Sequence, residues 1–131
     1  MPSKSVFTKI QALVEKKATL GLIQGRKPAS INEWNLAQAM TQLKVPFQYQ
    51  VRLGSGQGEP GGIILDFVAW TSTGPVAIPL RGGYWHRNSE AADNLADRIA
   101  QYYYGRVAPI MVEETQTIEA AIKAFRTKVG L

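Results

Sequence analysis

The chain has 131 residues, with 15 lysines and arginines, 10 aspartates and glutamates, one histidine and no cysteine, which gives a net charge of +5. This length suits one domain with one core, and the lack of cysteine excludes a disulfide framework and thiolate metal sites. No apolar run approaches the roughly 20 residues that a membrane span needs, and the first residues lack a signal-peptide core. We therefore expect an intracellular (cytoplasmic) or virion-associated protein without a membrane partner, whose positive charge suits an anion such as nucleic acid.

The first expected element is a helix from about Ser5 to Leu20. Its apolar residues recur at helical spacing with lysines between them: Val6, Ile10, Leu13 and Val14. A linker rich in glycine and proline follows, with Arg26 and Lys27 exposed. Residues 1–29 therefore form an N-terminal helix and linker, and residues 30–131 form the core of a single domain. The helix either packs on its own sheet or pairs between chains, giving a homo-oligomer.

The second expected helix begins at Ser30, because Ser30 and Glu33 fit a capping box in which the serine caps the helix and the glutamate reaches back. An apolar stripe then recurs at steps of three and four, formed by Leu36, Ala37, Met40 and Leu43. Val45 and Pro46 end this helix.

Three strands are expected next. Residues 47–53 alternate apolar and polar side chains, as a half-buried strand does. Residues 63–70 form a nearly continuous apolar run after a glycine-rich turn, and residues 75–80 form the third strand after a tight turn. The order predicts an antiparallel meander.

A third helix is expected after Asn88 or Ser89, either of which suits its N-cap, and it ends before Gly105. Its predicted buried face consists of Ala92, Leu95, Ile99 and Tyr102 or Tyr103. A fourth strand is expected at residues 107–112. The last helix is expected to bury Ile118, Ile122, Phe125 and Val129.

The predicted order is α-α-β-β-β-α-β-α. The passage from the third strand through the third helix to the fourth strand is a crossover, which places those two strands parallel. The expected fold is therefore α/β, with one mixed four-stranded sheet flanked by helices.

Asp66 is the residue that breaks this apolar scaffold. It lies in the middle of the second strand, where alternation places it on one face with Ile64 and Val68. A buried carboxylate without compensation costs several kcal/mol or takes up a proton. The compensation could come from a metal ion or an exposed pocket. The alternatives without a function are an ion pair with an arginine and a strand end that faces water.

Two further residues are candidates for chemistry. Glu33 is in line with Leu36 and Met40, so its carboxylate leans toward the core, although a capping-box glutamate needs no other role. His86, the only histidine, stands beside Trp85 and between Arg81 and Arg87. A histidine can be a metal ligand, a general base or a proton donor, or a hydrogen-bonded structural residue.

These segments resemble a known family. The stretch from Ser30 to about Glu114 is similar to the very-short-patch-repair endonucleases, which belong to the PD-(D/E)XK, or restriction-endonuclease-like, superfamily. The most specific parts are INEWNLAQAMTQLKVPFQYQ, GGIILDFVAW with its aspartate before phenylalanine, and IPLRGGYWH. The resemblance implies a restriction-endonuclease-like core and hydrolysis of a phosphodiester bond in DNA.

The resemblance also implies roles for particular residues. Asp66 matches the metal-binding aspartate, and Leu80 falls where a backbone carbonyl binds the metal, which would be Mg²⁺ or Mn²⁺. Glu33 matches the helix glutamate that positions metal-bound water, and His86 matches the histidine that assists proton transfer. The expected contacts to DNA phosphates and bases are Arg81, Arg87, Trp85, Lys27 and Arg26.

The third strand departs from the superfamily pattern, because Pro79-Leu80-Arg81 stands where an acid-x-lysine motif is usual. Arginine is neither a metal ligand nor a base near neutral pH, so Arg81 is expected to pair with Asp66 and displace the metal. Two functions follow. The first is a metal-dependent DNA endonuclease, with an acidic pocket containing Asp66 and Glu33. The second is an inactive nuclease fold that serves as a DNA-binding or structural component, for example of a phage particle, with Asp66 locked to Arg81.

Overall fold

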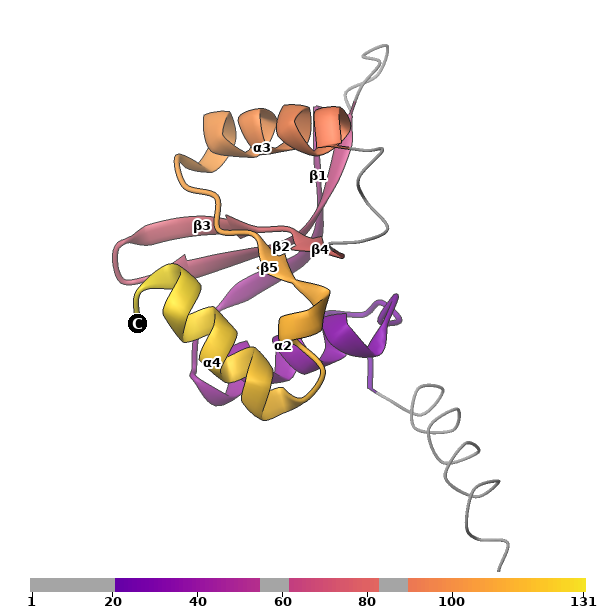
Figure 1. The fold of residues 1–131 in the computed structure, drawn as a ribbon, viewed down its shortest axis with the longest axis vertical. Coiled ribbons are helices and arrows are strands. Elements are labelled where there is room, and N and C mark those ends of the chain that lie inside the picture. The colour runs from indigo at the N-terminus through magenta and orange to yellow at the C-terminus, as the bar shows by residue number, and fades with distance from the viewer. Residues whose placement is uncertain (1–20, 55–61, 83–89) are drawn as a thin grey trace, which may run out of the picture.

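A computed structural model describes residues 21–54, 62–82 and 90–131 of the chain (Figure 1). In chain order the described elements are α2 (Ile31–Gln42), β1 (Phe47–Leu53), β2 (Ile63–Thr71), β3 (Gly74–Ile78), β4 (Leu80–Arg81), α3 (Glu90–Tyr104), β5 (Ile110–Met111), a 3₁₀ turn (Val112–Glu114) and α4 (Ile118–Val129). This confirms an α/β protein. The predicted N-terminal helix and the predicted caps of α3 lie outside the described residues.

Residues 21–30 form an ordered turn along the outer edge of β1. Ile23 and Arg26 pair through two backbone hydrogen bonds of 2.8 and 3.1 Å, and the Ile23 side chain is buried. The side-chain amide of Gln24 lies against β1, where its oxygen accepts the Tyr49 N–H at 2.9 Å and its nitrogen donates to the Phe47 carbonyl. Ser30 then caps α2 by accepting the Glu33 N–H at 3.1 Å, as predicted.

The antiparallel meander is also confirmed. β1 pairs with β2 from Phe47↔Ala69 to Leu53↔Ile63, and β2 pairs with β3 from Phe67↔Ile78 to Thr71↔Gly74. Gly74 closes the second hairpin with a φ of 115°, a value that favours glycine.

The predicted four-stranded sheet is wrong, because the described strands form one sheet of order β1-β2-β3 and a second sheet of β4 and β5. The physical reason is Pro79, which has no N–H for the ladder and separates β3 from β4. Its carbonyl accepts the Ile110 N–H at 3.0 Å, so β4 turns toward β5. The pairing of β4 with β5 is parallel, as is the bridge between Ala77 and Val107, which confirms the parallel crossover.

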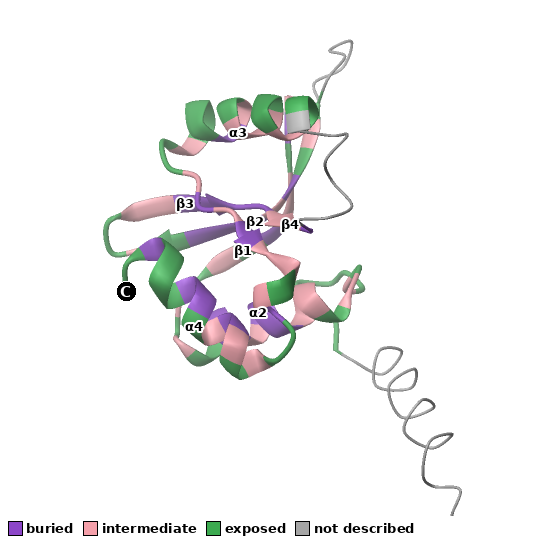
Figure 2. Ribbon diagram, viewed as in Figure 1, coloured by how far each residue is buried: buried purple, intermediate pink, exposed green. Residues whose placement is uncertain are grey.

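The helices lie on both sides of the strands, with α2 and α4 on one side and α3 on the other (Figure 1). The larger core lies between the α2–α4 side and the sheet, where Phe67, Phe125, Leu36 and Met40 are fully buried (Figure 2). A smaller core includes Leu53, Leu65, Val68, Ala77 and Ala100. As predicted, α4 buries Phe125 and Val129, while Ile118 and Ile122 are half-buried.

The predicted buried face of α3 is wrong. Leu95, Tyr102 and Tyr103 are exposed, whereas Ala100 is fully buried. The inward face carries Asp93, Ala96 and Asp97, one residue out of phase with the predicted stripe. A helix can turn two aspartates toward the strands here because Arg81 on β4 neutralises them.

Candidate active site

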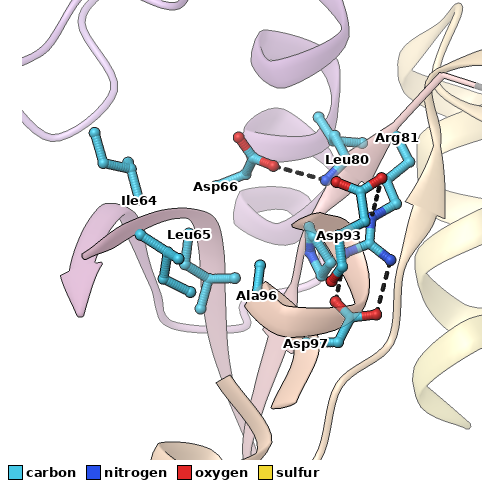
Figure 3. Close-up of a pocket in the computed structure, with 10 residues that line it drawn as sticks. Ile64, Leu65, Asp66, Leu80, Arg81, Asp93, Ala96 and Asp97 are labelled. Atoms are coloured by element: carbon cyan, nitrogen blue, oxygen red, sulfur yellow. Dashed lines mark hydrogen bonds and ion pairs between the residues drawn. The ribbon is translucent and has the colours of Figure 1, made fainter. Parts of the chain in front are cut away.

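Asp66 lies where the two sheets part. β2 is paired with β3 as far as Phe67, and the next position of the third strand is Pro79, which cannot donate. The Leu80 N–H, which follows, donates instead to the Asp66 side chain, with 2.8 Å between the nitrogen and Oδ2 (Figure 3). The carboxylate therefore fills the fork between β2 and β4.

The environment of Asp66 favours its protonated form. Burial raises the pKa of this carboxyl from 3.8 to about 6, the Leu80 hydrogen bond lowers it, the Glu33 charge raises it, and the Arg81 charge lowers it. Burial and the second carboxylate together outweigh the hydrogen bond and the cation. Asp66 is thus a carboxylate whose charge is poorly compensated.

Arg81 does not form the expected ion pair with Asp66. Its guanidinium binds the Asp97 carboxylate through two nitrogens, one of them at 2.8 Å, and its Nε lies 3.6 Å from Asp93 Oδ2. The hydrogen bond to Asp97 raises the pKa of Arg81, so its charge is permanent. Within the described parts of the chain, Asp66 has no ion-pair partner, and Arg81 reaches it only through its charge.

A cavity of about 110 Å³ opens at this fork, between β2, β4 and the first turns of α3. Three carboxylates and one guanidinium line it, from Asp66, Asp93, Asp97 and Arg81, and the aliphatic side chains of Ile64 and Leu65 form another part of its wall (Figure 3). The acidic pocket that the nuclease interpretation predicts is present, but the second and third carboxylates come from α3. Glu33 does not line it.

Glu33 lies on the first turn of α2, half-buried, with both carboxylate oxygens bound. The Ser30 hydroxyl donates to Oε2 at 3.3 Å, and the Tyr49 hydroxyl on β1 donates to Oε1. Burial and then the bond to Glu33 raise the pKa of Tyr49 to about 12, and the charge of Asp66 raises it further. Tyr49, Glu33 and Asp66 are therefore within electrostatic range of one another.

Gln50 on β1 lies opposite Asp66, between the pairs Tyr49↔Phe67 and Val51↔Leu65, and is itself unpaired. Its φ of 54° is left-handed, an uncommon backbone conformation for a residue other than glycine. The expected alternation of faces also fails at this point, because Leu65 and Phe67 belong to different core clusters, and Leu65 shares one with Val68. Asp66 therefore does not share a regular face with both Ile64 and Val68.

The other predicted contacts are only partly described. Arg26 and Lys27 are exposed on the turn beside β1, and Arg26 Nη1 donates to Gln50 Oε1 at 3.3 Å, which links that turn to the residue opposite Asp66. His86, Trp85 and Arg87 lie outside the described residues. Leu80 is placed beside Asp66, as expected.

Sequence reasoning missed Asp93, Asp97, Tyr49 and Gln50. Asp93 and Asp97 are four residues apart on one helix, a spacing that puts them on one face and could have been recognised. Tyr49 reads as an ordinary core position of an alternating strand, and the left-handed backbone of Gln50 has no signal in its residue type.

Two negative findings concern the described residues only. They contain no group of three histidine, cysteine or acidic side chains placed to hold a metal ion. They also contain no helix of the length and apolarity required to cross a membrane.

Comparisons with known proteins give no assignment: no family model, no curated protein and no solved structure matches this chain.

Proposed function

We propose that this protein is a metal-dependent endonuclease of the restriction-endonuclease-like fold, which hydrolyses phosphodiester bonds in DNA. The observation that carries the proposal is the condition of Asp66. Its carboxylate is largely buried, lines a cavity and has no ion-pair partner among the described residues. Such a group costs free energy, and a bound cation would recover that cost.

The arrangement of elements supports the proposed fold. One helix, α2, precedes the three-stranded meander, a crossover helix follows, and β5 runs parallel to the end of the third strand. Asp66 lies on the second strand at the point where the third strand leaves it. This is the placement that the resemblance implies for the metal-binding aspartate.

The described residues fit a hard divalent cation. Mg²⁺ is usually held by one or two carboxylates, with water and substrate phosphate completing its shell. Asp66 would be the principal ligand and Glu33 would act on the metal-bound water. A bound Mg²⁺ would polarise the phosphate and make a water molecule nucleophilic.

The Leu80 carbonyl is a further candidate ligand. Because the Pro79 carbonyl points to β5, and consecutive residues of a strand turn their backbone groups to opposite edges, Leu80 presents both its N–H and its carbonyl to the Asp66 side. The N–H is already bound to Asp66, and the carbonyl would face the same fork.

The remaining roles concern the substrate. Arg26 and Lys27, exposed on the turn that contacts Gln50, would hold phosphate oxygens beside the site. Arg81 would keep α3 in place through Asp97 and lend positive potential to the fork. For His86, Arg87 and Trp85 the proposal keeps the predicted roles of proton transfer, phosphate binding and DNA contact.

The test is nicking of supercoiled plasmid DNA in the presence of Mg²⁺ or Mn²⁺. We expect relaxation by the wild type, and activity at the metal-free level for Asp66→Asn, which keeps the size of the side chain and an acceptor for Leu80. Glu119→Gln, an exposed carboxylate on α4, is the matched control and should cleave as the wild type does. Unchanged cleavage by Asp66→Asn would remove Asp66 from the mechanism.

One observation favours a second function, an inactive nuclease fold that binds DNA or assembles with other molecules. No three-residue metal site exists among the described residues, and both oxygens of Glu33 are already bound. If no DNA form is cleaved with either metal, while DNA is still bound, this second function replaces the first.

A further inference from the structure

The Tyr49 hydroxyl meets three polar groups at once. It accepts the Ala29 N–H at 3.1 Å and the Gln50 Nε2 at 3.2 Å, and it bonds to Glu33 Oε1. The orientation of the Gln50 amide is fixed independently, because Arg26 donates to its oxygen at 3.3 Å. A phenol has one proton and two acceptor sites. With both acceptor sites filled by donors, the proton of Tyr49 must point at Glu33.

The Tyr49 ring is held as firmly as its hydroxyl. The side chain is only 5% exposed, and its ring packs against Phe67, with 5.1 Å between ring centroids. Phe67 is the partner of Tyr49 in the β1–β2 ladder and directly follows Asp66. The position of the hydroxyl is therefore set relative to the strand that carries Asp66.

Glu33 depends on this contact for its orientation. It lies on another element, α2, and of its two oxygens one is held by Ser30 of its own helix end and the other by Tyr49 of the sheet. Only the second bond ties the glutamate to the sheet. Without it, the Glu33 side chain would be free to rotate about the Ser30 contact.

We infer that Tyr49 is a positioning residue, whose hydroxyl orients the Glu33 carboxylate so that Glu33 and Asp66 act together on one divalent cation. This inference rests on the proposed function, since it needs a cation at Asp66. Tyr49 itself touches neither metal nor substrate. Its effect therefore falls on cation affinity more than on the reaction of the loaded protein.

The experiment measures Mn²⁺ binding to the whole chain by calorimetry, together with plasmid nicking across Mn²⁺ concentrations. Tyr49→Phe keeps the ring and removes the hydroxyl, and we expect about tenfold weaker Mn²⁺ binding, as for other partners of metal ligands. At saturating Mn²⁺ its nicking rate should return to nearly that of the wild type. Tyr104→Phe, a partly buried tyrosine beside the smaller core, is the matched control and should bind Mn²⁺ as the wild type does.

A double-mutant cycle tests whether Tyr49 acts through Glu33. Tyr49→Phe should have no further effect in a Glu33→Gln background, whereas independent, additive losses would overturn the inference. Glu33→Gln alone keeps the inference testable if Tyr49→Phe does not fold. If that variant binds Mn²⁺ like the wild type, Tyr49 has no ligand to position and the inference fails.

The outcomes separate the inference from the proposed function. If the wild type and Asp66→Asn bind Mn²⁺ equally, the cation site itself is absent and the proposed function fails. If binding requires Asp66 but Tyr49→Phe binds as the wild type does, the cation site stands and the role of Tyr49 is refuted.

Discussion

The two halves of β2 differ in how they are held. From Phe67 to Thr71 the strand is paired with β1 on one side and β3 on the other, and Phe67, Val68 and Ala69 are fully buried. From Ile63 to Asp66 it is paired with β1 alone; Ile64 is 56% exposed and Asp66 faces a cavity. One half therefore supplies stability, while the other leaves a carboxylate open to a ligand and loses stability for it.

The largest effect is expected in the paired half. Phe67→Ala removes a fully buried ring that contacts Phe47 and Tyr49, and should lower the free energy of unfolding by about 3 to 5 kcal/mol. Ile64→Ala, in the open half, should lower it by less than about 1 kcal/mol. Urea unfolding monitored by circular dichroism measures both. Equal losses would contradict the comparison.

A medium effect of opposite sign is expected for Asp66→Asn. The folded protein holds the pKa of Asp66 at about 6, above its ordinary value of 3.8. The folded state therefore binds this proton more tightly than the unfolded state, and Asp66 lowers stability progressively as the pH rises from about 4 to about 6. At about 1.4 kcal/mol per pKa unit, the wild type loses about 2 to 3 kcal/mol over that range.

Asn cannot lose a proton, so the variant should be more stable than the wild type at pH 8 by an amount that disappears below pH 4. Unfolding free energies at several pH values measure this difference. Glu119→Gln again serves as the control, since Glu119 is exposed. A constant difference at all pH values would mean that Asp66 is not the titrating group.

The smallest effect concerns the junction between the halves. Gln50→Gly relieves a left-handed backbone that costs about 1 to 2 kcal/mol, but gives up the hydrogen bonds to Arg26 and Tyr49. We expect a net gain of about 0.5 kcal/mol. Arg52→Gly, at an exposed position of the same strand without positive φ, should instead lose about 1 kcal/mol. A loss at both positions would show that Gln50 is not strained.

The paired half is also the part that the sequence predicts well. Strand β1 has the bounds expected from its alternation, β2 differs by one residue, and the Ser30 cap of α2 is where the residue types place it. These features follow from local rules, namely the period of two in strands and the preference of serine for an N-cap.

The open half could not be predicted to the same depth. Pro79 was recognised as unsuited to an interior strand, but the division into two sheets depends on where β5 accepts the departing strand. The choice of Arg81 between Asp66 and the α3 aspartates depends on the rotation of that helix. Its hydrophobic period was misleading, since Leu95 and Tyr102 face outward. Such tertiary choices outweigh local pattern.

The amide of Gln24 has a consequence for how the protein behaves at high concentration. β1 is an edge strand, and an unpaired edge is a template onto which another chain can add its own strand. By occupying the Tyr49 N–H and the Phe47 carbonyl, Gln24 blocks that template along the middle of the strand. A single side chain thus discourages edge-to-edge aggregation of the sheet.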